Sequence, residues 1–91
     1  MNRIERIRAA LEKALTPESL AIEDESQHHV GHAGAASGRG HFTVRIVSKA
    51  FAGVAPIQRH RLVYAALGAL METDIHALSI QALTPEEARA R

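Results

Sequence analysis

The order of the hydrophobic patterns along the chain restricts its fold more than any other sequence feature. Helical spacing of apolar residues is followed by two alternating segments, a second helical pattern, an apolar run typical of a strand, and the start of a last helix. The predicted elements span residues 2–15, 20–25, 41–48, about 56–71 and 75–82, with the last helix starting at Thr84. This α-β-β-α-β-α order predicts an α+β domain with a three-stranded mixed sheet covered by helices on one face. The helical connection between the second and third strands predicts a right-handed crossover, which makes these two strands parallel.

Local signals support the ends of the predicted helices. Asn2 is a suitable N-cap for the first helix, and Thr84 caps the last one, with Glu87 completing a capping box. The connector before the second long helix is expected to be anchored to the core by Phe51. The buried side of that helix is predicted to consist of Ile57, Leu62, Val63, Ala66, Leu67 and Leu70.

Size and composition exclude several classes of protein. The 91 residues are predicted to form one domain over residues 1–91, with a frayed tail from about residue 88. No segment approaches the roughly 18 apolar residues of a membrane span, and the charged N-terminus lacks a signal region, so a soluble cytoplasmic protein is expected. A net charge of +1 and an aromatic content of 3% argue against a dedicated nucleic-acid-binding protein.

The chain has six histidines and no cysteine. His28, His29, His32 and His41 lie in or beside a loop rich in Gly, Ala and Ser, predicted over about 28–40, whereas His60 and His76 follow later. Without thiolates the chain cannot hold an iron–sulfur cluster or a structural zinc ion in the usual way. It can still contribute one or two imidazoles to a metal centre whose other ligands come from something else.

The predicted loop leaves three interpretations open. It can be a flexible hairpin connection, since its glycines favour no packed structure. Its Gly31-His32-Ala33-Gly34 motif can grip a nucleic-acid backbone as in KH domains, although here it joins strands and carries no lysine. The third interpretation is a metal-facing loop that uses His32. A chelating cluster made by the loop histidines alone is expected to bind nickel or zinc only adventitiously, because ordering the loop costs entropy.

His76 opens the third predicted strand. Strict alternation places it on the face of Leu78 and Ile80, so it is either a histidine at the edge of the core or a metal ligand at a strand end. Asp74, two residues earlier, is the nearest candidate for an acid–base dyad with His76. Because the chain has no Cys nucleophile, no Ser-His-Asp arrangement and no phosphate-binding loop, a non-enzymatic protein without a small-molecule substrate is predicted.

Three consecutive residues with basic side chains, Arg59, His60 and Arg61, lie near the start of the second long helix. Consecutive residues point in different directions around a helix, so they cannot all face one groove. One alternative is a solvated surface with one residue contacting the sheet, and the other is a contact with phosphate or an acidic partner. The spacing of His60 from Ile57 and Val63 predicts partial burial of His60.

Six segments of the chain resemble the BolA family. They are GHAG (31–34), HFTVRIVS (41–48), FAG (51–53), RHRLVY (59–64), IHALSI (75–80) and TPEE (84–87). The resemblance implies a fold similar to class II KH domains. It also implies a heterodimer with a monothiol glutaredoxin that shares a [2Fe-2S] cluster, in which the glutaredoxin cysteine and glutathione supply the thiolates.

The resemblance further implies which residues bind the cluster. His76 matches the family's ligand in the third strand, and His32 matches the ligand in the loop, with His28, His29 and His41 as alternative loop ligands. Some family members are DNA-binding transcriptional regulators, and the Arg59-His60-Arg61 segment lies where such a contact can form. The near-neutral net charge makes DNA the second-ranked partner.

Overall fold

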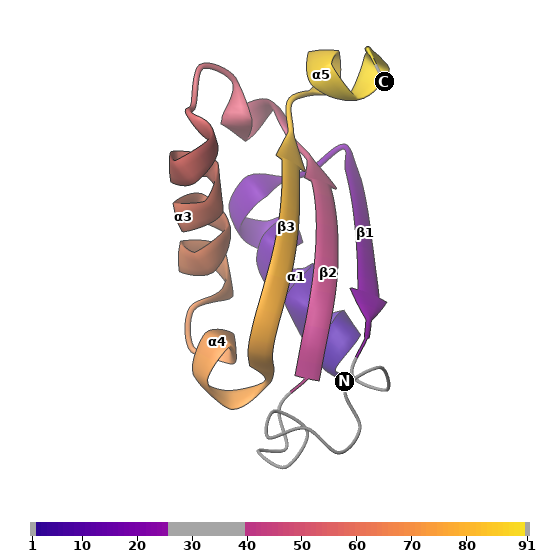
Figure 1. Cartoon of the computed structure of the whole chain (residues 1–91), viewed down its shortest axis with the longest axis vertical. Coiled ribbons are helices and arrows are strands. Elements are labelled where there is room, and N and C mark those ends of the chain that lie inside the picture. The colour runs from indigo at the N-terminus through magenta and orange to yellow at the C-terminus, as the bar shows by residue number, and fades with distance from the viewer. Residues whose placement is uncertain (1, 26–39, 91) are drawn as a thin grey trace.

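The computed structural model describes residues 2–25 and 40–90 and has the predicted mixed α+β architecture (Figure 1). Its sheet has the order β1-β2-β3, in which β1 pairs antiparallel with β2, and β2 pairs parallel with β3. The elements are α1 (Arg3–Leu15), β1 (Ser19–Asp24), β2 (Gly40–Val47), the 3₁₀ helix η2 (Lys49–Phe51), α3 (Pro56–Leu67), α4 (Leu70–Thr73), β3 (Ile75–Leu83) and α5 (Pro85–Arg89). Each strand therefore lies within one residue of its predicted bounds.

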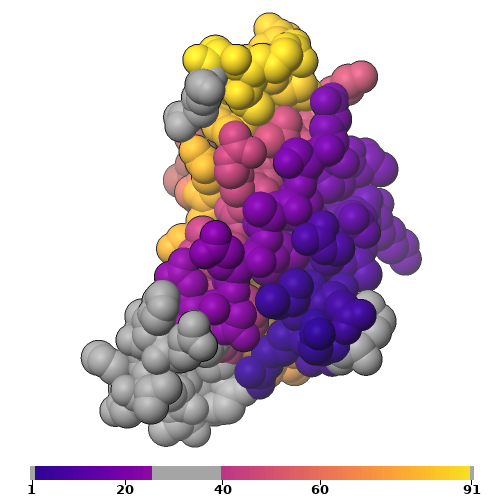
Figure 2. All heavy atoms as spheres, turned by 90° about the vertical axis from the view of Figure 1, so that its right-hand side faces the viewer, coloured from indigo at the N-terminus to yellow at the C-terminus, as the bar shows by residue number. Residues whose placement is uncertain are grey.

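The core lies between one face of the sheet and the two long helices. Alternate residues of the central strand, Phe42, Val44 and Ile46, are buried on this face. Ile7 and Leu11 of α1 and Val63 and Leu67 of α3 belong to the same apolar cluster. Figure 1 shows α1 and α3 on one face of the sheet, and Figure 2 shows the two layers from the side, with α1 in indigo. Within the described part of the chain, neither long helix lies on the opposite face of the sheet.

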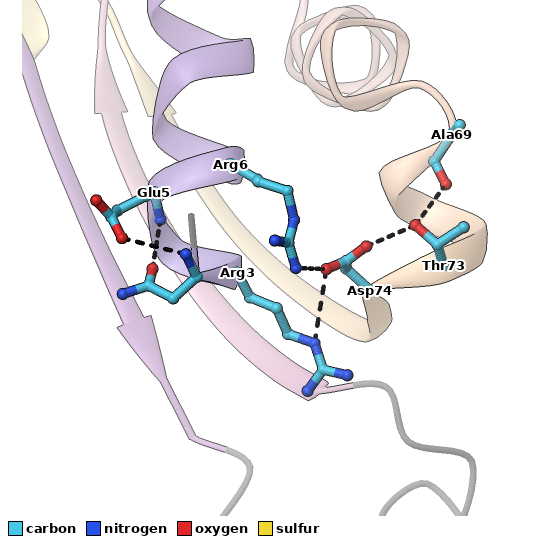
Figure 3. Close-up of polar contacts among 7 residues, drawn as sticks. Arg3, Glu5, Arg6, Ala69, Thr73 and Asp74 are labelled. Carbon is cyan, nitrogen blue, oxygen red and sulfur yellow. Dashed lines mark hydrogen bonds and ion pairs between the residues drawn. The ribbon is translucent and has the colours of Figure 1, made fainter.

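The predicted N-cap Asn2 and the predicted capping box of Thr84 and Glu87 are confirmed, and Asn2 also forms a capping box, with Glu5. The Asn2 side chain accepts a hydrogen bond from the Glu5 N–H at 2.8 Å, and the Glu5 carboxylate accepts one from the Asn2 N–H at 3.1 Å (Figure 3). Thr84 and Glu87 make the same reciprocal pair at the start of α5. These bonds satisfy backbone donors that the first turn of a helix leaves without intrahelical partners.

The connector after β2 is held to the core as predicted. Phe51 is fully buried. The buried Ser48 hydroxyl donates to the Leu15 carbonyl at 2.6 Å and accepts from the Ala50 N–H at 3.0 Å. The end of α1 is therefore tied to the turn that follows the central strand.

The second long helix differs from its prediction in length and in its buried side. It ends at Leu67, because Gly68 takes a positive φ of 53°, and the short α4 follows. Ile57 is 61% exposed, whereas Val63 is fully buried. Ile57 lies six residues before Val63, about 120° away around the helix axis at 3.6 residues per turn, so it points away from the sheet. Leu62 is 38% exposed for the same geometric reason, so the predictions for both residues were wrong.

Candidate functional site

One end of the sheet gathers the residues of the candidate site. The parallel strands β2 and β3 both start there, and the antiparallel β1 ends there. The Gly40 N–H donates to the Asp74 carbonyl at 2.9 Å, and the Glu25 N–H donates to the His41 carbonyl at 2.8 Å. Both junctions with the segment 26–39 therefore lie at the end where β3 begins. The predicted ligands His28, His29 and His32 lie outside the described residues.

A β-bulge turns His76 away from the core. Gly40 is paired with Ile75 and His41 with Ala77, so His76 is an additional residue in β3. Ile75 is 1% exposed and belongs to the core, whereas His76 is exposed. The extra residue breaks the strict alternation that predicted His76 on the face of Leu78 and Ile80, as bulges do when they re-aim a side chain. The interpretation of His76 as a core-edge residue is thus wrong.

The His76 imidazole lies against that of His41. The two ring centroids are 5.1 Å apart and the rings are tilted by 49°. His41 is half-buried and its Nε2 atom is buried, whereas His76 is exposed to solvent. The contact therefore joins an exposed ring to one that is partly enclosed by the protein.

Asp74 anchors the turn before this strand rather than forming a dyad with His76. Its carboxylate accepts a hydrogen bond from Arg6 at 2.5 Å and one from the Thr73 hydroxyl at 2.6 Å, and the Arg3 Nε lies 3.6 Å away (Figure 3). The Thr73 hydrogen bond, followed by that of Arg6, lowers the pKa of Asp74 below its ordinary value of 3.8. The carboxylate thereby links the start of α1 to the turn from which His76 emerges.

The chemistry of the described donors suits part of a metal site. Among the residues that the structure describes, no group of three or more His, Cys, Asp or Glu side chains can hold a metal ion. His76 nevertheless offers an exposed imidazole, which is a suitable ligand for iron, copper or zinc. An iron–sulfur cluster bound here would need its remaining ligands from elsewhere, which fits a site completed by a thiolate-bearing partner.

The three residues of the Arg59-His60-Arg61 segment differ in their contacts and exposure. Arg59 donates to the carbonyls of Val54 at 2.7 Å and Ala82 at 3.0 Å and to the Glu87 carboxylate at 2.6 Å. Its side chain is only 12% exposed, which matches the alternative in which one of the three residues contacts the sheet. His60 and Arg61 are exposed. Partial burial of His60 was therefore a wrong prediction, because Arg59 makes the contact between this turn and the sheet.

The ion pair of Arg59 and Glu87 predicts that the stability of the fold decreases at acidic pH. The Arg59 hydrogen bond lowers the pKa of Glu87 from its ordinary value of 4.5 to about 2. The contribution of this ion pair to stability is then complete above pH 4.5 and is lost as the pH falls toward 2. We expect Glu87→Gln, which keeps an oxygen acceptor for the Thr84 N–H, to lower Tm at neutral pH. The difference in Tm from the wild type should shrink between pH 4.5 and 2.

Thermal unfolding followed by circular dichroism across this pH range measures the difference. Glu86→Gln is the matched control, since Glu86 is an exposed residue of the same helical turn. It should change Tm little at any of these pH values. A Tm difference for Glu87→Gln that stays constant down to pH 2 would contradict the prediction.

Within residues 2–25 and 40–90, no helix is long and apolar enough to cross a membrane. This finding applies to the described helices, of which the longest, α1, has 13 residues.

Comparisons with known proteins identify relatives over nearly the whole chain. Residues 11–87 match the family of BolA-like proteins. Protein BOLA1, chloroplastic, from Arabidopsis thaliana is 48% identical over 99% of this chain and 58% of its own length. The DNA-binding transcriptional regulator BolA of Haemophilus influenzae is 38% identical over 93% of this chain and 80% of its own length.

Structural similarity agrees with the sequence comparisons. The solved structure of BolA1 from Arabidopsis thaliana superposes with a TM-score of 0.82 at 48% identity, covering 96% of each chain. This chain spans 58% of the length of the BolA1-type relatives that it matches. The family match, the sequence identities and the common fold lead to one conclusion: the chain belongs to the family of BolA-like proteins.

Proposed function

We propose that this protein is a non-enzymatic adaptor that binds a monothiol glutaredoxin and shares a [2Fe-2S] cluster with it. In the heterodimer, His76 and His32 supply imidazole ligands, and the glutaredoxin cysteine and glutathione supply thiolates. The cluster is cargo for trafficking or for iron regulation, not a group that this chain holds alone. The proposal follows from the family to which the chain belongs and from the chemistry of its donors.

The exposure of His76 is the observation that carries the proposal. The bulge in β3 presents this imidazole to solvent at the end of the sheet, although Ile75, directly before it, is buried in the core. The segment that contains His32 joins the described chain at the same end. An exposed imidazole beside a protein surface can enter a ligand set that two proteins share.

Histidine ligation also suits a cluster that must be released. Replacing thiolate by imidazole on one iron raises the reduction potential of a [2Fe-2S] centre, as Rieske centres illustrate. Binding through imidazole depends on protonation and is therefore reversible by mild changes in conditions. A cluster held partly by this chain would be labile and transferable.

A titration of the wild-type protein tests the proposal. The purified protein is added to a [2Fe-2S]-loaded monothiol glutaredoxin with glutathione, and visible circular dichroism is recorded at each step. We expect a new spectrum that saturates near one equivalent. An unchanged glutaredoxin spectrum at excess protein would contradict cluster sharing.

A DNA-binding regulator is the second candidate, and the Haemophilus influenzae relative, which carries that description, favours it. The described structure narrows the surface to His60 and Arg61, because Arg59 is engaged in internal contacts. Fluorescence anisotropy with duplex DNA over a salt series would test it. Arg61→Ala should then weaken binding and reduce the salt slope by about one. Equal affinities of Arg61→Ala and the wild type would exclude this surface.

A further inference from the structure

The contact between the two imidazoles at the start of β3 suggests a role for His41 that differs from metal ligation. His41 and His76 come from adjacent strands, and their ring centroids lie 5.1 Å apart. The bulge makes His76 an added residue in β3, because His41 pairs with Ala77. The two rings are therefore in contact although their residues are not paired in the sheet.

The Nε2 nitrogen of His41 is poorly placed to act as a ligand for a bulky cluster. Its side chain is half-buried on the central strand, and its Nε2 atom is buried. A cluster held between two proteins needs a donor nitrogen that reaches the protein surface. His76 meets this requirement, since it is exposed.

The backbone around this pair is held on both sides. The Gly40 N–H binds the Asp74 carbonyl, and the Asp74 carboxylate is bound by Arg6 and Thr73. Ile75 is buried in the core directly before His76. Since the backbone is fixed, the remaining freedom of His76 lies in its side-chain torsions, and a solvent-exposed side chain usually samples several staggered rotamers.

From these contacts we infer that His41 is a positioning residue, whose ring packs against the His76 imidazole and holds it in one orientation for metal ligation. The role in ligation rests on the proposed function, whereas the ordering of the His76 ring does not. Fixing one side chain before binding avoids an entropy cost that would otherwise lower affinity by about two- to ten-fold. The packing surface of the His41 ring therefore carries this role.

Two substitutions separate shape from ligation. His41→Phe keeps a planar ring at the contact but removes both nitrogens, and His41→Ala removes the ring. In the titration with [2Fe-2S]-loaded glutaredoxin, His41→Phe should give the wild-type spectrum with Kd within about two-fold. His41→Ala should give the same spectrum with Kd raised by about two- to ten-fold. Loss of the spectrum in His41→Phe would overturn the inference by showing that His41 is a ligand.

A second measurement requires no cluster. NMR relaxation of the ¹³C-labelled His76 ring in the free protein reports how well the imidazole is ordered. We expect equal order in the wild type and His41→Phe and lower order in His41→Ala, with backbone amide shifts distant from the site unchanged. Equal His76 order in all three proteins would overturn the inference. If the ring loses order as expected while no protein forms the mixed complex, the proposed function fails and the positioning contact remains.

Discussion

Replacing His76 with alanine is expected to abolish the mixed [2Fe-2S] complex with glutaredoxin and to leave the fold intact. The imidazole is exposed, so its removal should change the free energy of unfolding by no more than about 0.5 kcal/mol. Loss of a ligand should weaken the shared site by more than about 100-fold, because even changes to the surroundings of ligands cost 10–100-fold. Visible circular dichroism of the complex and urea unfolding of the free protein measure the two effects.

His60→Ala is the matched control for this prediction. It removes the same side chain from another exposed position, on α3, where the proposed function assigns no ligand. The control should form the mixed complex with the wild-type spectrum. A His76→Ala protein that still gives the wild-type spectrum would contradict the assignment of His76 as a ligand. Equal loss in both variants would indicate a general effect of removing surface imidazoles.

The fold was predictable because its signals are local. Capping boxes need residues only three positions apart, and the structure has those of Asn2 with Glu5 and of Thr84 with Glu87. Alternation in the central strand reflects a sheet with one buried face, and its buried residues follow the pattern without interruption from Gly40 to Ile46. The order of these signals then leaves few ways to connect three strands and two long helices.

The parts that sequence reasoning missed depend on contacts between distant residues. The Arg59–Glu87 pair spans 28 positions and the Arg6–Asp74 pair spans 68, so no local spacing predicts either of them. The first pair removes Arg59 from the predicted binding surface. The second gives Asp74 an anchoring role, whereas the sequence offered it only as the nearest candidate for a dyad with His76.

The position of His76 along its strand was predicted, but its orientation was not. The start of the third strand was the right place for His76, yet strict alternation assigned it to the core face. The bulge that exposes His76 arises from the register between β2 and β3, and register is a property of the paired strands rather than of either sequence alone. The assignment of His32 as the second ligand stays a prediction, since it lies outside the described residues.

The largest effect on stability is expected from Phe51→Ala. The ring is fully buried in the core cluster, and the Arg59 guanidinium lies 6.0 Å from its centroid. Truncating a buried Phe typically costs about 3–5 kcal/mol through lost burial and the cavity left behind. Domains of this kind are stable by only about 5–15 kcal/mol, so the variant should unfold at a much lower urea concentration. Urea denaturation measures this loss of stability, provided that the m value of the variant equals that of the wild type.

Ile57→Ala is the matched control, because Ile57 is an apolar residue that is 61% exposed, and its truncation should cost about 0.5 kcal/mol or less. Phe51 follows the end of β2, whereas His76 lies at the opposite end of the paired strands, near the start of β2. At temperatures where Phe51→Ala remains folded, it should therefore retain the mixed-complex spectrum that His76→Ala loses. A loss of stability below about 1 kcal/mol would show that Phe51 does not anchor the connector. Loss of the spectrum in folded Phe51→Ala would show that the two ends of the sheet are coupled.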